Sequence, residues 1–355
     1  TALPAWSWEV ENKSTSTSTW SNYDSSIVID GLGGAVRSGK KLSLNLLATL
    51  KSSGITAVHQ TIPAPGDDYE KTKKAIKETK ALIALHSDTL KLITSAHYIV
   101  EAKRHKQVGI IMGFQSTEMF GSHLERVKEF ADAGVKIMQL SYNNRSQFGA
   151  GGLVKTKTGL TELGKQAIEQ MQKHNVLVDV SHSAKQTVAD AIQYSQKPIS
   201  ISHTGCNAIY RHPRNNDDAE LRSLANKGGV VGIYLMPFLE GGEHEIKADM
   251  VIRHIEHALN VCGSDHVAIG TDQGIAAVND TPEYREMIRK EVLRRKAAGI
   301  SAPGETPNRP PFIPELNSER RIELIAHRLQ KKGHSERVIE QVIGKNWLRL
   351  YDQSW

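Results

Sequence analysis

The 355-residue chain has little cysteine and no long hydrophobic run, and each absence excludes a class of protein. Its two cysteines, Cys206 and Cys262, both lie in apolar stretches, so we expect buried free thiols and no disulfide framework. A membrane-spanning helix needs roughly eighteen or more consecutive apolar residues, and the sequence has no such run. We therefore expect no membrane span.

The sequence also lacks a basic stripe with interleaved aromatic residues, which nucleic-acid binding would favour. The net charge of +6 comes from scattered Lys and Arg residues, which we interpret as a solvated surface. A composition of 39% apolar and 24% charged residues is typical of a globular protein with a core. We therefore expect no nucleic-acid partner.

The first 26 residues are rich in Ser, Thr and Trp and have no clear periodicity. We interpret residues 1–26 as an N-terminal extension and residues 27–355 as one domain. The sequence begins at Thr1, which is typical of a processed chain, so we expect an exported or periplasmic protein. A cytoplasmic location is the alternative.

Short runs rich in β-branched residues alternate with amphipathic stretches along the domain. The expected strands are residues 26–30, 56–62, 109–114, 135–142, 176–182, 198–203, 229–236 and 267–271. Buried strands that alternate with helices indicate a parallel sheet, and eight such units predict an α/β fold of the (β/α)8 TIM-barrel class. An open doubly wound sheet is the alternative, but no Gly-rich dinucleotide loop follows an early strand.

Beyond the expected barrel strands, the C-terminal part of the chain has two kinds of segment. The proline-rich residues 302–314 predict a long surface loop. Residues 320–332 and 335–343 are expected to form C-terminal helices.

The fifth and sixth expected strands both end in Ser-His, at Ser181-His182 and Ser202-His203. Parallel strands joined by a helix place their C-terminal ends at the same edge, where barrels carry their active sites. We therefore expect His182 and His203 to lie side by side. Two neutral imidazoles can bind a divalent metal such as zinc, whereas a hydrogen-bonded structural histidine is the alternative for either one.

Further polar residues lie at other strand ends, including Gln115, Tyr142 and Asp272. Asp272 suits a metal ligand or a general acid/base, and a turn or helix-cap aspartate is the alternative. Arg214 follows the sixth expected strand, where a guanidinium would bind a substrate carboxylate; a surface arginine that caps the loop is equally consistent with the sequence.

Several motifs occur in a characteristic order. They are Leu177-Val-Asp-Val-Ser-His182, Ile201-Ser-His203, His212-Pro-Arg-Asn215, Gly228-Gly-Val-Val-Gly232, Gly270-Thr-Asp272 and Gly344-Lys-Asn-Trp-Leu-Arg349. Over residues 27–350 the chain thereby resembles the membrane (renal) dipeptidase family, which belongs to the metal-dependent amidohydrolase barrels.

Members of that family hold two zinc ions bridged by a glutamate. The resemblance implies that His182 and His203 ligate one metal and that Asp272 ligates the other and handles a proton. It also implies that Arg214 binds the substrate carboxylate, and Tyr142 stands where many members have a substrate-binding histidine. We place Gln115 and Asn215 with these two among the substrate-binding residues, and the resemblance suggests a homodimer.

The sequence departs from the family at three metal ligands. Leu32 and Gly34 stand where the family has a His-x-Asp pair, and Gln115 replaces the bridging glutamate. A neutral carboxamide lacks the charge that holds two cations together, so we expect the second metal site to be lost. One divalent metal, zinc by preference, would remain on His182 and His203, with Glu118 and His59 open as replacement ligands.

These residues predict a dipeptidase-like metallohydrolase that acts on a dipeptide or an N-acyl amino acid. In this hypothesis His182, His203 and Asp272 are the catalytic residues, and Asp272 takes and returns a proton. The alternative is a metal-poor relative that carries out a different small-molecule reaction, such as a lyase or isomerase step, or that only binds a ligand.

Overall fold

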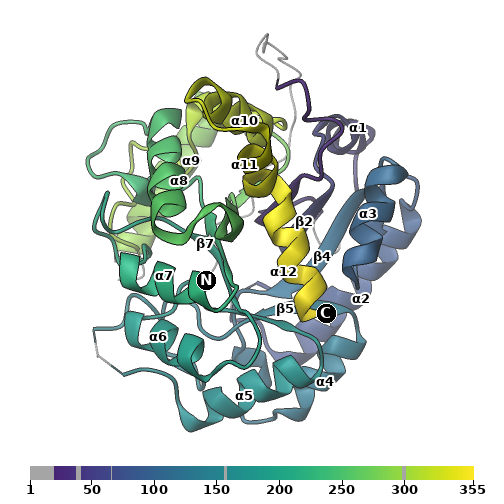
Figure 1. Cartoon of the computed structure of the whole chain (residues 1–355), viewed down its shortest axis with the longest axis vertical. Coiled ribbons are helices and arrows are strands. Elements are labelled where there is room, and N and C mark those ends of the chain that lie inside the picture. The colour runs from purple at the N-terminus through teal and green to yellow at the C-terminus, as the bar shows by residue number, and fades with distance from the viewer. Residues whose placement is uncertain (1–19, 37–40, 65, 156–157, 298–300) are drawn as a thin grey trace.

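The computed structural model describes residues 20–36, 41–64, 66–155, 158–297 and 301–355, and its centre is one curled parallel sheet (Figure 1). The strands follow the order β10-β1-β2-β4-β5-β6-β7-β8-β9. Their bounds are β1 (Ile29–Gly34), β2 (Ala57–Thr61), β4 (Val108–Phe114), β5 (Val135–Gln139), β6 (Leu177–Asp179), β7 (Ser200–Thr204), β8 (Val230–Ile233), β9 (Val267–Ile269) and β10 (Gln273–Gly274). The chain runs from β9 into β10 over only a few residues, and β10 pairs with β1. The last part of the sheet therefore lies beside the first strand, and the sheet is curled. The predicted (β/α)8 TIM-barrel class is confirmed.

The strand β3 (Leu90–Leu92) was, like β10, not predicted from the sequence. It pairs with the first residues of β4, whereas β5 pairs with the last residues of β4. A run of Leu-Lys-Leu is too short to show a period of two, and so gives no strand signal.

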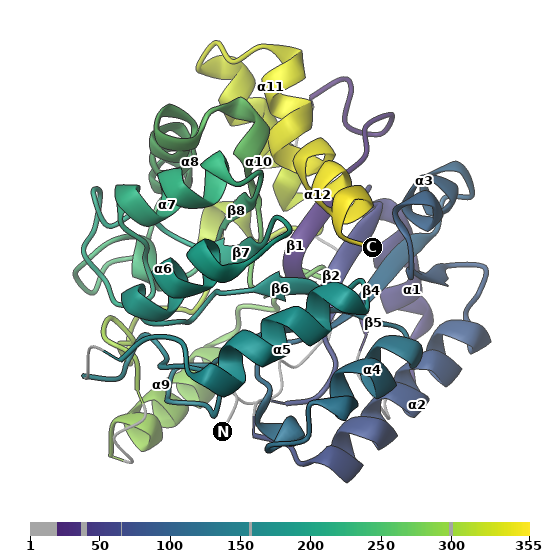
Figure 2. The same cartoon turned by 60° about the horizontal axis from the view of Figure 1, so that its bottom comes forward.

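Helices surround the sheet, as Figures 1 and 2 show. Their bounds are α1 (Leu44–Ser52), α2 (Tyr69–Leu85), α3 (Ala96–Arg104), α4 (Glu125–Asp132), α5 (Glu162–Lys173), α6 (Lys185–Tyr194), α7 (Asp218–Asn226), α8 (Ala248–Cys262), α9 (Pro282–Ala297), α10 (Arg321–Lys331), α11 (Glu336–Glu340) and α12 (Asn346–Ser354). No helix in the described part of the chain is both long enough and apolar enough to cross a membrane. Both cysteines are free thiols, as predicted; Cys206 is buried and Cys262 is partly buried.

Helix α12 closes the N-terminal end of the barrel. Trp347, Leu350 and Tyr351 pack in one buried cluster with residues near the starts of the strands, such as Ile29 and Leu177. The indole Nε1 of Trp347 donates to the carbonyl oxygen of Ile269 at 2.9 Å. Because this end is filled by large side chains, the C-terminal strand ends form the mouth available for a site.

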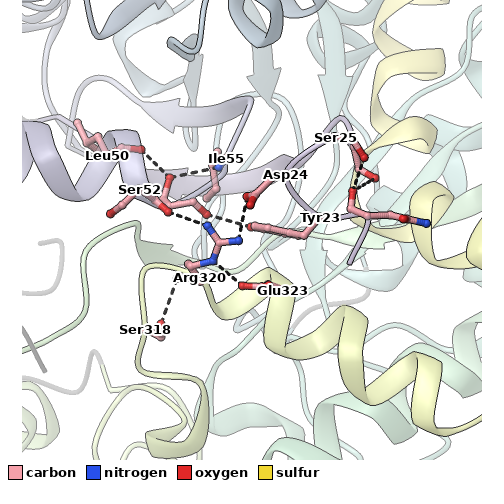
Figure 3. Close-up of polar contacts among 12 residues, drawn as sticks. Tyr23, Asp24, Ser25, Leu50, Ser52, Ile55, Ser318, Arg320 and Glu323 are labelled. Atoms are coloured by element: carbon pink, nitrogen blue, oxygen red, sulfur yellow. Dashed lines mark hydrogen bonds and ion pairs between the residues drawn. The ribbon is translucent and has the colours of Figure 1, made fainter. Parts of the chain in front are cut away.

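The described part of the predicted N-terminal extension packs on the barrel. Trp20 and Tyr23 are each 1% exposed and belong to the main core. Arg320 holds this segment: its guanidinium donates to the carboxylate of Asp24 at 2.9 Å and lies over the Tyr23 ring at 4.9 Å (Figure 3). Residues 1–19 lie outside the described residues.

The proline-rich segment does not lie wholly on the surface, so the prediction of a surface loop was wrong for residues 309–313, which are buried. The guanidinium of Arg309 donates to the carbonyl oxygens of Pro237 and Gly304, both at 2.8 Å. Proline lacks a backbone N–H, so a proline-rich segment leaves fewer donors that need a partner when it is buried. In Figure 2, helix α9, which precedes this segment, lies at the opposite end of the barrel from α12.

Candidate functional site

The predicted site residues meet at the mouth of the barrel. Gln115 directly follows β4, Tyr142 and His182 lie three residues beyond β5 and β6, and His203 lies within β7. The rings of His182 and His203 are 4.8 Å apart between centroids, at an interplanar angle of 62°. The Tyr142 ring stacks on His182 at 4.2 Å. The predicted pairing of the two histidines is therefore confirmed.

Two of these residues have an unfavourable backbone conformation. Among the described residues, four non-glycine residues have a positive φ, and they include His182 at 63° and Asp272 at 56°. A left-handed conformation costs an L-residue roughly 1–2 kcal/mol, because its Cβ approaches the following carbonyl oxygen. Such strain is frequent at functional sites, where the surrounding structure holds the side chain in a required direction.

The ring of His182 is held in one tautomer. Its Nδ1 lies 2.7 Å from the Asn143 side-chain oxygen, which only accepts, so Nδ1 carries the proton and Nε2 has a lone pair. This Nε2 is buried and has no hydrogen-bond partner in the described structure. Burial, together with the charge of Arg214, lowers the pKa of His182 well below its ordinary value, so the ring is neutral.

The ring of His203 has a matching arrangement. Its Nε2 lies 3.4 Å from the side-chain nitrogen of Gln115, which donates, and its Nδ1 lies 2.8 Å from the hydroxyl of Ser202. The proton is therefore on Nδ1, and Nε2 accepts. Burial and the charge of Arg214 again lower the pKa well below its ordinary value.

Arg214 is a buried cation at this mouth. Its side chain lies in the loop between β7 and α7, the residue is 4% exposed, and its buried Nη2 has no hydrogen-bond partner among the described residues. Its guanidinium carbon lies 5.9 Å from the ring centre of Tyr234. Burial lowers the pKa of Arg214, and the nearby Tyr234 and Asp272 act in the opposite direction. The sequence alternative of an exposed loop-capping arginine is excluded.

The side chain of Asn215 is used within the protein. Its nitrogen donates to the carbonyl oxygens of Tyr210 and Phe238 at 2.8 and 3.0 Å, and its oxygen accepts from the Tyr234 hydroxyl. Asn215 therefore holds the loop that carries Arg214, and these bonds leave no amide hydrogen for a substrate.

Two groups near Arg214 have shifted proton affinities. Burial raises the pKa of Asp272 to about 6, although Arg214 lowers it in part. Burial, followed by the negative charge of Asp272, raises the pKa of Tyr142 to about 12. At neutral pH Asp272 is therefore ionised and close to its pKa, while Tyr142 keeps its proton.

The metal-ligand set is small. No group of three His, Cys, Asp or Glu side chains within the described ranges comes together in a way that could hold a metal ion. Glu118 is exposed, and the Nδ1 of His59 bonds to the Gly31 carbonyl oxygen at 2.8 Å while its buried Nε2 has no partner in the described structure. Neither residue forms a set of three with His182 and His203 within the described ranges. The unpartnered Nε2 of His182 and the imidazole of His203, whose ring centroid lies 4.8 Å from that of His182, are the groups that could hold a metal ion.

Three polar residues of the site were missed in the sequence analysis: Asn143, Ser202 and Tyr234. Asn143 and Ser202 each bond to the Nδ1 of a site histidine, and Tyr234 lies between Asn215 and Arg214. Asn143 follows Tyr142 directly and Ser202 precedes His203 directly, so position beside a site residue was the available signal. Tyr234 lies in an apolar run and gave none.

Comparison with known proteins gives the family. The model of the membrane dipeptidase family, peptidase family M19, matches residues 39–301. An uncharacterized dipeptidase from Schizosaccharomyces pombe is 26% identical over 304 residues, which cover 82% of this chain and 71% of the relative. An uncharacterized protein of the pqqA 5′ region of Klebsiella pneumoniae is 25% identical over 301 residues, which cover 82% of this chain and 98% of that protein.

Solved structures agree. An amidohydrolase from Pseudomonas aeruginosa is 28% identical, with a TM-score of 0.80 over 94% of this chain and 98% of that one. A metallo peptidase from Rhodobacter sphaeroides, liganded with a phosphinate mimic of the dipeptide L-Ala-D-Ala, shares the fold at 18% identity; the TM-score is 0.73 over 93% of this chain and 100% of that one. The family model covers most of the domain, and the chain therefore belongs to the membrane dipeptidase family of hydrolases.

Proposed function

We propose that this protein hydrolyses a small amide that carries a free carboxylate, either a dipeptide or an N-acyl amino acid. The observation that carries the proposal is the buried guanidinium of Arg214, whose Nη2 has no hydrogen-bond partner in the described structure. Burying a cation without a partner is unfavourable, and a substrate carboxylate would supply two charge-assisted hydrogen bonds. Arg214 would thereby fix the position of the substrate.

Asp272 suits the proton transfers of such a reaction. Its pKa of about 6 leaves it ionised at neutral pH, able to accept a proton from the attacking water and return it to the leaving amine. The hydroxyl of Tyr142, with a pKa of about 12, would stay protonated and donate a hydrogen bond to the substrate. Both groups interact electrostatically with Arg214, so a substrate held there would lie within their reach.

The lone pairs on Nε2 of His182 and His203 are the groups that would hold one divalent metal, zinc by preference. Such an ion, when bound, polarises the scissile carbonyl and lowers the pKa of water. The two rings are neutral and keep these lone pairs free of protons at neutral pH.

An ion pair near the mouth of the barrel favours a small substrate. Arg295 on α9 and Glu305 in the following segment form a bidentate ion pair, with distances of 2.9 and 3.0 Å, and their side chains are 8% and 12% exposed. Both charges act on the phenol of Tyr142, which places this pair near the site. A long peptide would have to displace it.

The test uses the full chain purified without chelator or added metal. Metal content is measured first, and dipeptides and N-acyl amino acids are then screened for hydrolysis with zinc, manganese and cobalt. Turnover that is lost in Arg214→Gln but kept in Arg211→Gln, an exposed arginine of the same loop, is the expected result. Ligand binding that depends on Arg214 without turnover under any metal would overturn the hydrolase proposal and favour a ligand-binding protein.

A further inference from the structure

The two strands that carry the histidines share little backbone pairing. β6 and β7 are in register at a single residue pair, Asp179 with Ser200, whereas β2 and β4 share five pairs. One more backbone bond joins them, from the Val180 nitrogen to the Ser200 oxygen at 2.9 Å. Side-chain bonds must therefore hold the strand ends where the imidazoles begin.

The carboxylate of Asp179 supplies those bonds. It is fully buried, and one of its oxygens accepts from the backbone nitrogen of Ser181 at 2.7 Å. Its other oxygen accepts from the backbone nitrogen of Ser202 at 2.9 Å and from the hydroxyl of Ser200 at 2.8 Å. A single side chain thus binds the backbone N–H of the serine that precedes each histidine.

Two hydroxyl groups extend this arrangement to the ring of His203. The hydroxyls of Ser181 and Ser202 lie 3.1 Å apart, and the backbone nitrogen of His203 donates to the Ser181 oxygen at 3.1 Å. The Ser202 hydroxyl accepts from Nδ1 of His203 at 2.8 Å, so its own proton is donated to Ser181. Because Gln115 donates to Nε2 of His203, Nδ1 carries the proton, and the direction of the bonds between Nδ1, Ser202 and Ser181 follows from it.

We propose that Asp179 is a positioning residue, which through the backbone of Ser181 and Ser202 sets the spacing between the two imidazoles and keeps the Ser202 hydroxyl where it supports the Nδ1-protonated tautomer of His203. Asp179 bonds to the backbone N–H groups of Ser181 and Ser202 and to the hydroxyl of Ser200. It acts on the site indirectly, because Ser202 in turn bonds to the imidazole of His203. The role in catalysis rests on the proposed function, because the Nε2 lone pair that Asp179 directs at the mouth is the one assigned there to a metal. Groups that orient a ligating histidine typically change metal affinity by about 10–100-fold when they are mutated.

The test compares Asp179→Asn and Ser202→Ala with two controls that alter the same chemistry elsewhere. Glu323→Gln changes a buried carboxylate on α10 that bonds to Arg320, and Ser354→Ala removes a buried hydroxyl at the opposite end of the barrel. The deciding readout is the nitrogen NMR spectrum of the His203 imidazole in the metal-free full chain, with a His203→Gln variant to assign it.

In both site variants we expect His203 to lose its single Nδ1-protonated tautomer, and zinc affinity measured by calorimetry to fall about tenfold or more. Both controls should leave the His203 signals and the zinc affinity unchanged. A folded Asp179→Asn protein with a wild-type His203 spectrum would overturn the proposal. If Asp179→Asn does not fold, an unchanged His203 spectrum in Ser202→Ala would overturn it instead. The spectrum needs neither substrate nor metal, so a failure of the hydrolase proposal would leave this result intact.

Discussion

Replacing Arg214 with methionine should make the protein more stable while removing its ability to bind a carboxylate. Arg214 is 4% exposed and its Nη2 has no partner in the described structure, so folding removes a charge from water with incomplete compensation. The effective penalty for burying one ion is several kcal/mol, and Asp272 and Tyr234 offset part of it. Methionine has a similar length and no charge, and Asp272, with a pKa of about 6, can take up a proton once the guanidinium is gone. We therefore expect the free energy of unfolding of Arg214→Met to rise by about 1–3 kcal/mol. For a chain of 355 residues, that corresponds to a rise in Tm of roughly 1–4 °C.

The assay measures chemical and thermal unfolding of both proteins, with and without a dipeptide. A ligand at about 100 times its Kd stabilises the folded state by about 2.7 kcal/mol, and this gain should appear in the wild type and be absent from Arg214→Met. The exposed Arg211 provides the control, because Arg211→Met should change neither stability nor the response to the dipeptide by more than about 0.5 kcal/mol.

Two results would refute this reasoning. A variant less stable than the wild type by more than about 1 kcal/mol would show that the guanidinium has a compensating partner in the folded protein. Equal stabilisation of both proteins by the dipeptide would show that the carboxylate binds elsewhere. The pKa of Asp272 offers an independent check, because Arg214 lowers it and its loss should raise that pKa above about 6.

Three further predictions concern proton transfer, metal affinity and packing. The value of kcat/KM should rise with pH and reach half its maximum near pH 6, because Asp272 must be ionised. The raised pKa of Asp272 also means that its contribution to the free energy of unfolding is present below about pH 3.8 and is lost as the pH rises through about 6, which pH-dependent unfolding would detect. Gln115→Glu should raise zinc affinity at least about tenfold by calorimetry, because it adds a carboxylate beside the two imidazoles, and unchanged affinity would contradict the assigned metal position. Gly113→Ala should lower the free energy of unfolding by about 1–3 kcal/mol, because its Cβ would lie 2.0 Å from Nε2 of His59. The control Gly34→Ala, whose Cβ would have its nearest neighbour among the described residues at 4.0 Å, should leave stability unchanged or slightly raised.

The fold and the central pair of the site could be predicted because their signals are local in sequence. Runs of Val and Ile mark buried strands, and Ser-His at the ends of two consecutive strands indicates that the two imidazoles meet. Burial of residues 309–313 could not be predicted, because it depends on the bond from Arg309 to the carbonyl oxygen of Pro237, 72 residues away. The motif around Arg214 also marks Asn215, but only the structure shows that the Asn215 amide is bonded within the protein.

The two ends of the barrel differ in how they contribute to stability. At the N-terminal end, α12 fills the barrel with well-packed aromatic side chains. At the mouth, by contrast, Arg214 is a cation without a full set of partners, and His182 and Asp272 have a left-handed backbone. Glycine at either position would relieve that strain, and an apolar residue at 214 would remove the charge, so the mouth has features that stability alone does not explain.

The state of the imidazoles then favours hydrolysis over simple binding. A pocket that only bound a carboxylate would gain affinity from protonated histidines beside Arg214, since each would add a positive charge. Instead, burial and the charge of Arg214 hold the pKa of both His182 and His203 well below the ordinary value, and Asn143 and Ser202 hold the proton of each ring on Nδ1. Each Nε2 is thereby left with a lone pair, the form in which histidine binds a metal ion. A neutral imidazole pair next to a guanidinium whose Nη2 has no partner in the described structure is the arrangement expected where one group binds the substrate and the other two bind the ion that activates it.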